Sequence, residues 1–295
     1  MRHAAVLLML MAALLAGCAR PVSLPRPAPD ALRVASHNVH FIRMTKARGP
    51  WSVADWHSRK HALDAVFKEA GADLIAFQEM VSIGPDENRD VNLARDWLLA
   101  RNPGYGLAAT GDWRSFPTRQ PIFYRQDRLR LLDHGWFFYD APEVVARDRQ
   151  RRGFWLYYAS WAEFSAPGQG QRAFRVYNVH FHFLDAAKRR HAARQLAAHV
   201  QPALAAGMPV LVLGDMNALA GWRTVRILRD AGLEIADPPG GSFHFNRGLH
   251  ILPAIDRLGR APNVTLLGGP WALRGQRAGD WPSDHYPVVA DIAVP

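Results

Sequence analysis

Short apolar segments, each bounded by turn-forming residues, recur along most of this 295-residue chain. They have the length of buried or half-buried strands. Helical patterns lie between some of them, at 58–71, 186–206 and 222–231, and the first starts at a capping-type Ser58 and stops at Gly71. The irregular alternation predicts one α/β domain of layered sheets with outer helices. The predicted strands are 32–35, 74–77, 121–124, 174–179, 210–213 and 288–290.

The N-terminal segment follows a different pattern. A positively charged start and an apolar run too short to cross a bilayer predict a secretory signal peptide over 1–17. The run ends in Leu-Ala-Gly-Cys18, which resembles the lipobox of bacterial lipoproteins, and Cys18 is the only cysteine. In that family the cysteine becomes the lipid-modified first residue, so Cys18 is the expected lipidation site. An ordinary signal peptide with a chance cysteine is the alternative.

Proline dominates the next stretch, which we expect to be an extended tether over 18–30 between the anchor and a domain spanning 31–295. Together these features predict an exported, membrane-anchored lipoprotein facing the periplasm or the cell exterior. A single cysteine also excludes an internal disulfide. The sequence indicates no protein partner.

The chain is basic, with a formal net charge of +10, and loss of the signal peptide with its Arg2 lowers this by one. Positive charge attracts phosphate-bearing or anionic membrane partners over long range and says nothing about fold. It favours polyanions such as DNA or RNA slightly, although anionic lipid head groups suit it as well.

The most specific local signal is a buried strand that runs into Gly214-Asp-Met-Asn217. Loops at the carboxyl end of a strand free side chains from the packed sheet, so ligands and catalytic groups gather there. Asp215 can orient or deprotonate a water, and Asn217 can bond a phosphate oxygen or the carboxylate. The alternative is a turn in which both side chains bond their own backbone.

Polar residues close several other apolar segments in the same way. Asp284-His285 precedes the last predicted strand, and a carboxylate beside a histidine can hold it protonated and oriented next to a phosphate. A carboxylate at a strand end also suits a hard cation. Taken singly, each is more often a solvated strand end. The further positions are Asn38, Gln78-Glu79, Asn178, His180 and Asp256.

The order of these residues resembles that of the endonuclease/exonuclease/phosphatase superfamily, which includes DNase I-like nucleases, apurinic-site endonucleases, inositol phosphatases and bacterial sphingomyelinases. The resemblance covers 31–295, and the Gly-Asp-x-Asn and Ser-Asp-His elements are its specific parts. It implies a four-layered α/β sandwich of the DNase I type: two packed, mostly antiparallel sheets flanked by helices, with the active site where strand edges converge.

The resemblance also implies roles for these side chains. It implies Mg²⁺ (or Mn²⁺) held mainly by Glu79, with Asn38 and Asp284 near it. Asp215 would activate the attacking water, and Asn217 would position the water or the phosphate. His285, paired with Asp256, would stabilise developing charge, and His180 would do so from the other side. Arg152 and Asn178 are the expected phosphate contacts.

The chain departs from the family where Asn-x-His-x-Asp becomes Asn178-Val-His180-Phe-His182, which puts the surroundings of His180 in doubt. The His-x-His pair invites a zinc interpretation, but Zn²⁺ needs three or four converging N or S ligands, and no cysteine stays free after lipidation. Arg152 lies in a dense basic run whose simpler interpretation is a solvated loop. No role can be assigned to 243–250.

We therefore expect an exported Mg²⁺-dependent phosphoesterase that cleaves phosphodiesters, with nucleic acid slightly favoured. The runner-up is a phospholipid (sphingomyelinase-like) or small phosphoester hydrolase, and the different class is an inactive phosphate-binding module. Asp215 and His285 are expected at a solvent-facing strand edge. Asp215→Asn or His285→Ala should then abolish turnover with little change in thermal stability.

Overall fold

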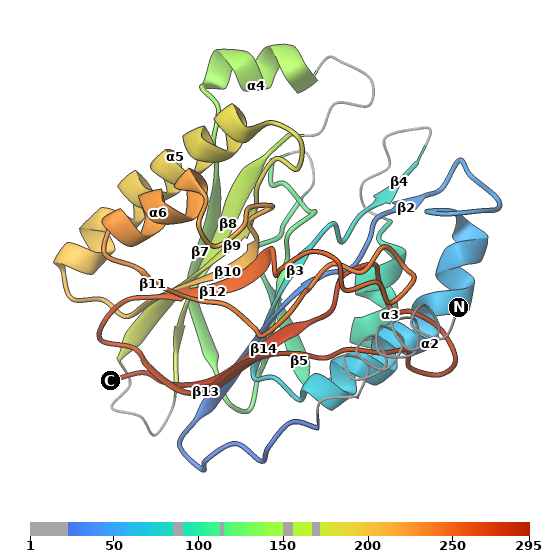
Figure 1. Ribbon diagram of the computed structural model, residues 1–295, viewed down its shortest axis with the longest axis horizontal. Coiled ribbons are helices and arrows are strands. Elements are labelled where there is room, and N and C mark those ends of the chain that lie inside the picture. The colour runs from blue at the N-terminus through green and yellow to red at the C-terminus, as the bar shows by residue number, and fades with distance from the viewer. Residues whose placement is uncertain (1–22, 85–90, 113–114, 150–155, 167–171) are drawn as a thin grey trace, which may run out of the picture.

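Two six-stranded sheets pack face to face between layers of helices (Figure 1). The computed structural model describes residues 23–84, 91–112, 115–149, 156–166 and 172–295. The predicted signal peptide, Cys18 and Arg152 lie outside these ranges. The first sheet has the order β13 (Thr265–Ala272), β14 (Val288–Ala293), β1 (Leu32–Asn38), β3 (Leu74–Gln78), β6 (Ile122–Arg125), β5 (Tyr105–Ala108).

The second sheet has the order β11 (Glu234–Ala236), β12 (Asp256–Arg260), β10 (Val210–Asp215), β9 (Ala173–His180), β8 (Tyr158–Ser165), β7 (Arg130–Phe138). A small sheet pairs β2 (Ile42–Arg43) with β4 (Ser82–Ile83). The predicted fold class, a sandwich of mostly antiparallel sheets flanked by helices, is confirmed.

Each large sheet contains one parallel pair, and every other neighbouring pair in it is antiparallel. The pairs are β1 with β3 and β9 with β10. Parallel neighbours need a crossover connection, usually a helix. Here the crossovers are α2 (Val53–Ala70) and α5 (Ala186–Ala205). Each pair therefore sends two strand ends to the same edge of its sheet.

The two crossover helices follow their capping chemistry. The N-cap of α2 is Ser52, six residues before the predicted Ser58, because the Ser52 hydroxyl accepts from the Asp55 N–H at 3.1 Å. The helix ends as predicted at Gly71, which is left-handed with φ 53°. In α5, Asp185 caps the N–H groups of Ala187 and Lys188. The remaining helices are α3 (Leu93–Arg101), α4 (Pro142–Arg149) and α6 (Arg223–Asp230).

The core is buried on both faces of the first sheet. Val34 and Leu74 belong to the cluster between the sheets, whereas the next residues, Ala35 and Ile75, belong to the cluster under α2. This alternation is the two-residue period of a strand. A fully buried side chain of this kind contributes about 1.5–3 kcal/mol, so both layers hold the strand ends in register.

All six predicted strands are present, most of them longer at their polar ends, and the three predicted helices correspond to α2, α5 and α6. The sequence analysis missed α3 and α4, the small β2–β4 sheet, the edge strands β5, β7, β11 and β13, and the interior strands β8 and β12. Part of the predicted tether lies on the body, where Leu24 packs against the cluster under α2 and Arg33 donates to the Pro25 carbonyl at 2.6 Å. Within the described residues, no helix is long and apolar enough to cross a membrane.

Candidate active site

The ends of the parallel strands bring the predicted residues together. In the second sheet, His180, Asp215 and Asp256 lie side by side in register at the ends of β9, β10 and β12. In the first sheet, Asn38 at the end of β1 is paired with Gln78, and Glu79 follows directly. The two sheets meet at this point, because the Asn38 amide donates to Asp215 Oδ2 at 3.2 Å although the two residues are 177 positions apart in sequence.

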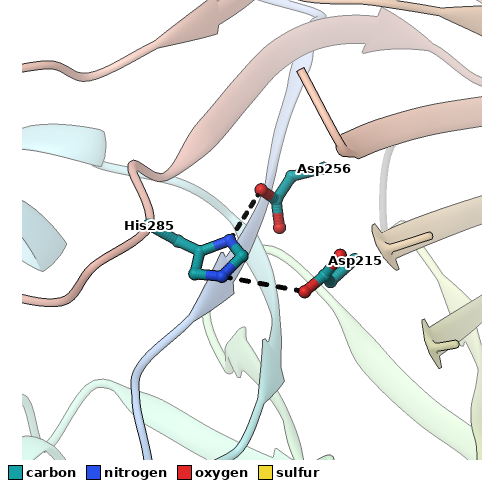
Figure 2. Close-up of side chains that lie close together, drawn as sticks. All are labelled: Asp215, Asp256 and His285. Atoms are coloured by element: carbon teal, nitrogen blue, oxygen red, sulfur yellow. Dashed lines mark hydrogen bonds and ion pairs between the residues drawn. The ribbon is translucent and has the colours of Figure 1, made fainter. Parts of the chain in front are cut away.

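Asp215 Oδ2 is the centre of the cluster. His180 Nε2 lies 3.7 Å from it and His285 Nε2 lies 3.8 Å from it. Both distances exceed a hydrogen bond, so the histidines do not bond Asp215 directly, and one water or phosphate oxygen beside them could bond to Asp215 and to an imidazole at once. The other carboxylate oxygen accepts the Asn217 N–H at 2.9 Å, which orients the group. Figure 2 shows His285 between Asp215 and Asp256.

His285 and Asp256 form a direct pair, with Nδ1 2.9 Å from Asp256 Oδ2. Burial would lower the pKa of His285, but the charge and hydrogen bond of Asp256 outweigh it and raise the pKa well above its usual value. Burial, followed by repulsion from Asp256, raises the pKa of Asp215 to about 7. Burial also lowers the pKa of His180 to about 3, so this ring is neutral. The site thus holds one cationic and one neutral imidazole around a single carboxylate.

Glu79 and Asn38 form the first-sheet wall of the site. The Asn38 amide donates to Glu79 Oε1 at 3.3 Å, and the other Glu79 oxygen accepts the Phe41 N–H at 3.3 Å. Burial and the nearby charge of Asp284 raise the pKa of Glu79. The charge of Asp284 thus disfavours ionisation of the buried Glu79.

Asp284 is fixed by a serine and a histidine. The Ser283 hydroxyl donates to the Asn38 carbonyl at 2.6 Å and lies 3.2 Å from Asp284 Oδ1. His40 Nδ1 lies 3.1 Å from the same Oδ1. Burial would raise the pKa of Asp284, but the hydrogen bond and charge of His40 hold it well below its usual range. Asp284 is therefore a permanent carboxylate at neutral pH.

These residues fit a divalent cation. Carboxylate oxygens are the ligands Mg²⁺ prefers, and a cation would offset the burial and repulsion that raise the pKa of Glu79. Asp215, Asp256 and His285 also have potential ligand atoms within 4.8 Å of one another, but there the direct His285–Asp256 bond occupies the space between two of them. The oxygen-rich side at Glu79 and Asp284 suits Mg²⁺ better. Asn38 directs its N–H groups, not its oxygen, at the carboxylates, so its amide would have to turn over to bind a metal.

The backbone at these strand ends is strained. Glu79 and Asn217 have φ of 56° and 45°, the left-handed region that costs a non-glycine residue about 1–2 kcal/mol. Gly214 has φ 151°, and a Cβ there would lie 2.0 Å from the Val179 carbonyl oxygen. The glycine before Asp215 is thus required by the neighbouring strand. Such strain is typical of functional positions held by the surrounding fold.

Two predictions need correction. Asn178 is fully buried, and its amide donates to the carbonyls of Phe77, Gln120 and Pro121 at 2.7–3.3 Å, so it has no free N–H for the predicted phosphate contact. Asp215 and His285 are buried, with 1% and 6% exposure, and do not lie at a solvent-facing edge. The loop that carries His285 pairs with the loop before β12, since the His244 N–H donates to the Asp284 carbonyl and the Tyr286 N–H donates to the Ser242 carbonyl.

The structure also gives contacts for His182 and for the 243–250 segment, to which the sequence analysis assigned no role. His182 Nδ1 accepts the N–H groups of Leu184 and Asp185, so it shapes the loop before α5. In the unassigned 243–250 segment, the Phe243 ring lies 4.9 Å from the His285 ring and forms one wall of the site.

Sequence reasoning missed Arg59, which clamps two site loops. Its guanidinium donates to the carbonyls of Val39, His40 and Pro282 at 2.6–3.0 Å and is 3% exposed. It thereby ties the chain after Asn38 to the chain before Asp284. An arginine on the apolar face of α2, four residues before Leu63, was the available signal.

Known structures share this architecture. An endonuclease/exonuclease/phosphatase family protein from Bacteroides thetaiotaomicron is 19% identical, with a TM-score of 0.66 over 90% of this chain and 98% of that chain. A mannosyl-6-phosphatase from the same species is 18% identical, with a TM-score of 0.66 over 89% and 99%. TDP2 from D. rerio, complexed with single-strand DNA product, is 14% identical, with a TM-score of 0.58 over 90% and 99%. No curated protein sequence matches the chain.

The sequence profile of the Endonuclease/Exonuclease/phosphatase family matches residues 35–285, which contain every residue of the cluster described above. This range covers well over half of the chain, from within β1 to His285. The chain therefore belongs to the endonuclease/exonuclease/phosphatase family and is a hydrolase of phosphoester bonds.

Proposed function

We propose that this protein is an exported, Mg²⁺-dependent phosphodiesterase that acts on nucleic acid. The observation that carries the reaction is the position of Asp215 Oδ2, within 3.7–3.8 Å of two histidines in different protonation states. This arrangement leaves space for a water beside a base and places a positive charge beside it. Both are needed for hydrolysis of a phosphoester by an in-line water.

Each side chain has a separable role in the proposed reaction. Asp215 accepts the proton of the attacking water, since its pKa of about 7 suits proton transfer near neutral pH. The cationic His285, kept protonated by Asp256, stabilises the charge that builds on the phosphate oxygens. The neutral His180 donates a hydrogen bond from the opposite side. Asn217 holds Asp215 through its backbone N–H.

Glu79 and Asp284 would hold the divalent cation, with Asn38 after its amide turns. When bound, the cation would neutralise charge on the phosphate and lower the pKa of a water. A direct test is thermal unfolding with and without Mg²⁺. A ligand at 100 times its Kd stabilises the folded state by about 2.7 kcal/mol, and Glu79→Gln should reduce this gain. Equal stabilisation of both proteins by Mg²⁺ would contradict this assignment.

Nucleic acid is the proposed substrate because the chain carries a net charge of +10, which favours polyanions. The structural similarity to TDP2 with a DNA product agrees with this choice. The similarity to a mannosyl-6-phosphatase, with a higher TM-score, favours a sugar phosphate as the second candidate.

Hydrolysis of a substrate panel tests the proposal. Purified 19–295 would be assayed with Mg²⁺ and with EDTA on plasmid DNA, RNA, sphingomyelin, inositol phosphates, mannose 6-phosphate and bis-p-nitrophenyl phosphate. We expect EDTA-sensitive cleavage of DNA or RNA. Turnover confined to a lipid or a sugar phosphate would contradict the proposed substrate but not the proposed mechanism. If no ester is hydrolysed, the result would support an inactive phosphate-binding module.

Export and anchoring through Cys18 form a separate part of the proposal. The pattern of the first 30 residues supports it, and a lipidated Cys18 would leave only a short stretch before Leu24, which packs on the body. Metabolic labelling with a palmitate analogue should mark the full-length protein and not Cys18→Ser. Label on both proteins, or on neither, would contradict lipidation at this residue.

A further inference from the structure

A basic cavity lies between the starts of α5 and α6, outside the catalytic cluster. Its volume is ≈ 260 Å³, and four of its lining residues are arginines: Arg189, Arg190, Arg223 and Arg226. Among the described residues that line it, none is acidic. The two helices lie side by side in Figure 1, and their first turns supply all four guanidinium groups.

Little in the described part of the chain neutralises these charges. Neither the Arg190 nor the Arg226 side chain makes a hydrogen bond or ion pair there. Arg223 has a single partner, Asp230, at 3.6 Å, and both side chains are at least 60% exposed, so that pair is weak. Among the described residues, Asp185 near Arg189 and Asp230 near Arg223 offset part of this charge, and the four arginines leave an excess of positive charge that a bound anion would offset.

Arg189 differs from its neighbours because it is buried, with 4% exposure. Its Nη1 donates to the carbonyls of His182 and Phe183 at 3.0 and 2.8 Å, and its guanidinium lies 5.1 Å from the Trp222 ring. Within the part of the chain that the structure describes, its Nε–H has no hydrogen-bond partner. A buried donor without a partner is costly, so an acceptor at this wall of the cavity would relieve it.

The start of α6 adds further donors. Its N-cap residue is Trp222, and no side chain caps the first turn. An indole offers only a donor and cannot accept from the helix N–H groups. The first backbone N–H groups, next to Arg223 and Thr224, therefore keep their capacity for an anion, which the helix dipole also favours.

The cavity adjoins the catalytic cluster through two short loops. One loop follows His180 and carries the carbonyls that Arg189 holds, and the other follows Asp215 and leads to Trp222. The Asn217 amide joins the loops by donating to the Phe181 carbonyl at 3.0 Å. Because the carbonyls that Arg189 binds belong to the second and third residues after His180, the cavity wall lies on the order of 10 Å from the reacting centre.

We propose that this arginine cavity is a second phosphate subsite, which takes a non-reacting phosphate of a substrate that carries at least two. The binding of phosphate in this cavity does not depend on the proposed function, but the inference that this phosphate belongs to the enzyme's substrate rests on it. A phosphate bound there would accept from Arg189, Arg190, Arg226 and the α6 backbone, and it would hold the scissile phosphate at Asp215. The enzyme would then prefer multiply phosphorylated substrates over single phosphodiesters.

Protection from an arginine reagent tests the subsite without any need for activity. The full domain, in EDTA, would be treated with phenylglyoxal with and without inorganic phosphate, and modification would be read at each arginine by peptide mass spectrometry. We expect phosphate to slow modification of Arg190 and Arg226 about tenfold. Arg194, which is exposed on α5 outside the cavity, is the internal control and should react equally in both. Equal slowing at Arg194, or none at Arg190 and Arg226, would overturn the proposal.

A kinetic comparison tests the role in substrate choice. For each protein, kcat/KM would be measured on a 5′-phosphorylated dinucleotide and on bis-p-nitrophenyl phosphate, which carries one phosphate. In the variant with Arg190→Ala and Arg226→Ala, the ratio of the two values should fall about tenfold or more, mainly through KM on the dinucleotide. Arg194→Ala, which removes the same type of charge, should keep the wild-type ratio. An unchanged ratio in the double variant would overturn the subsite. If none of the proteins hydrolyses either substrate, the proposed function is refuted, and the protection experiment alone decides whether the subsite exists.

Discussion

Two clusters of polar side chains lie near the ends of β3 and β9, and they differ in how completely their polar groups are hydrogen-bonded within the protein. The closed cluster contains Ser36, Gln78, Gln120, Ser160 and Asn178, all at most 3% exposed. The open cluster contains Glu79, His180, Asp215, Asp256 and His285. The two clusters are adjacent along the chain. Gln78 at the end of β3 belongs to the closed cluster, and Glu79, the next residue, belongs to the open one. On β9, Asn178 belongs to the closed cluster and His180 to the open one.

In the closed cluster every side chain makes at least one hydrogen bond. The Gln78 amide donates to Asn178 Oδ1 at 2.7 Å, and the Gln120 amide donates to the carbonyls of Tyr158 and Asn178 at 3.0 Å. In the open cluster the contacts of Asp215 with the two histidines are 3.7–3.8 Å, and Asp256 Oδ1 has no hydrogen-bond partner among the described residues. A few residues along the same strands therefore separate polar groups that stabilise the sandwich from groups left ready for a ligand.

The largest expected effect breaks the open cluster at its centre. Asp215→Asn removes the proposed base, so kcat should fall about 10³-fold. Stability should change little, because the folded state already disfavours the ionised carboxylate, whose pKa is about 7. Steady-state kinetics and thermal unfolding of the two proteins provide the measurement. Wild-type turnover by Asp215→Asn would remove this residue from the mechanism.

His285→Ala should reduce both activity and stability, in contrast to Asp215→Asn. It leaves the Asp256 carboxylate buried without its partner, which should lower the free energy of unfolding by about 3 kcal/mol. Denaturant unfolding measures this loss. Adding Asp256→Asn to the variant should restore part of the stability, because the unpaired charge is gone. Loss of stability that the second substitution does not restore would contradict the explanation.

Breaking the closed cluster should affect stability first. Asn178→Ala leaves three backbone carbonyls without this donor, and we expect a loss of about 2 kcal/mol in unfolding free energy. The kcat of the folded enzyme should change far less than in Asp215→Asn. If turnover disappears while the unfolding midpoint is unchanged, Asn178 contacts substrate after all and the division between the clusters is wrong.

The smallest effect is expected at the rim of the closed cluster. The Ser160 hydroxyl donates only to the Gln120 carbonyl, at 2.6 Å, so Ser160→Ala should cost about 1 kcal/mol. Calorimetric unfolding should resolve this shift, and kcat and KM should stay at wild-type values. A change in kinetics at this site would indicate that the two clusters are coupled.

Sequence reasoning identified most of the open cluster because each member ends an apolar segment with a residue of recognisable chemistry. It placed Asn178 at the site together with His180, because both follow the same alternation on β9 and only their partners in the fold differ. Arg59 and His40 were missed because their functions depend on loops distant in sequence. The arginine cavity was missed because Arg189 and Arg223 come from separate helices.

The sequence by itself determined the strand ends, the glycine before Asp215 and the family, because strand periodicity and turn chemistry act over a few residues. Only the tertiary structure decided which polar groups are satisfied, which histidine carries a proton and where the arginines gather. Hydrogen bonding and charge depend on distance in space, and the two parallel pairs bring together residues as far apart as Asn38 and Asp215. The function of a buried polar residue is therefore set by partners that its own segment does not contain.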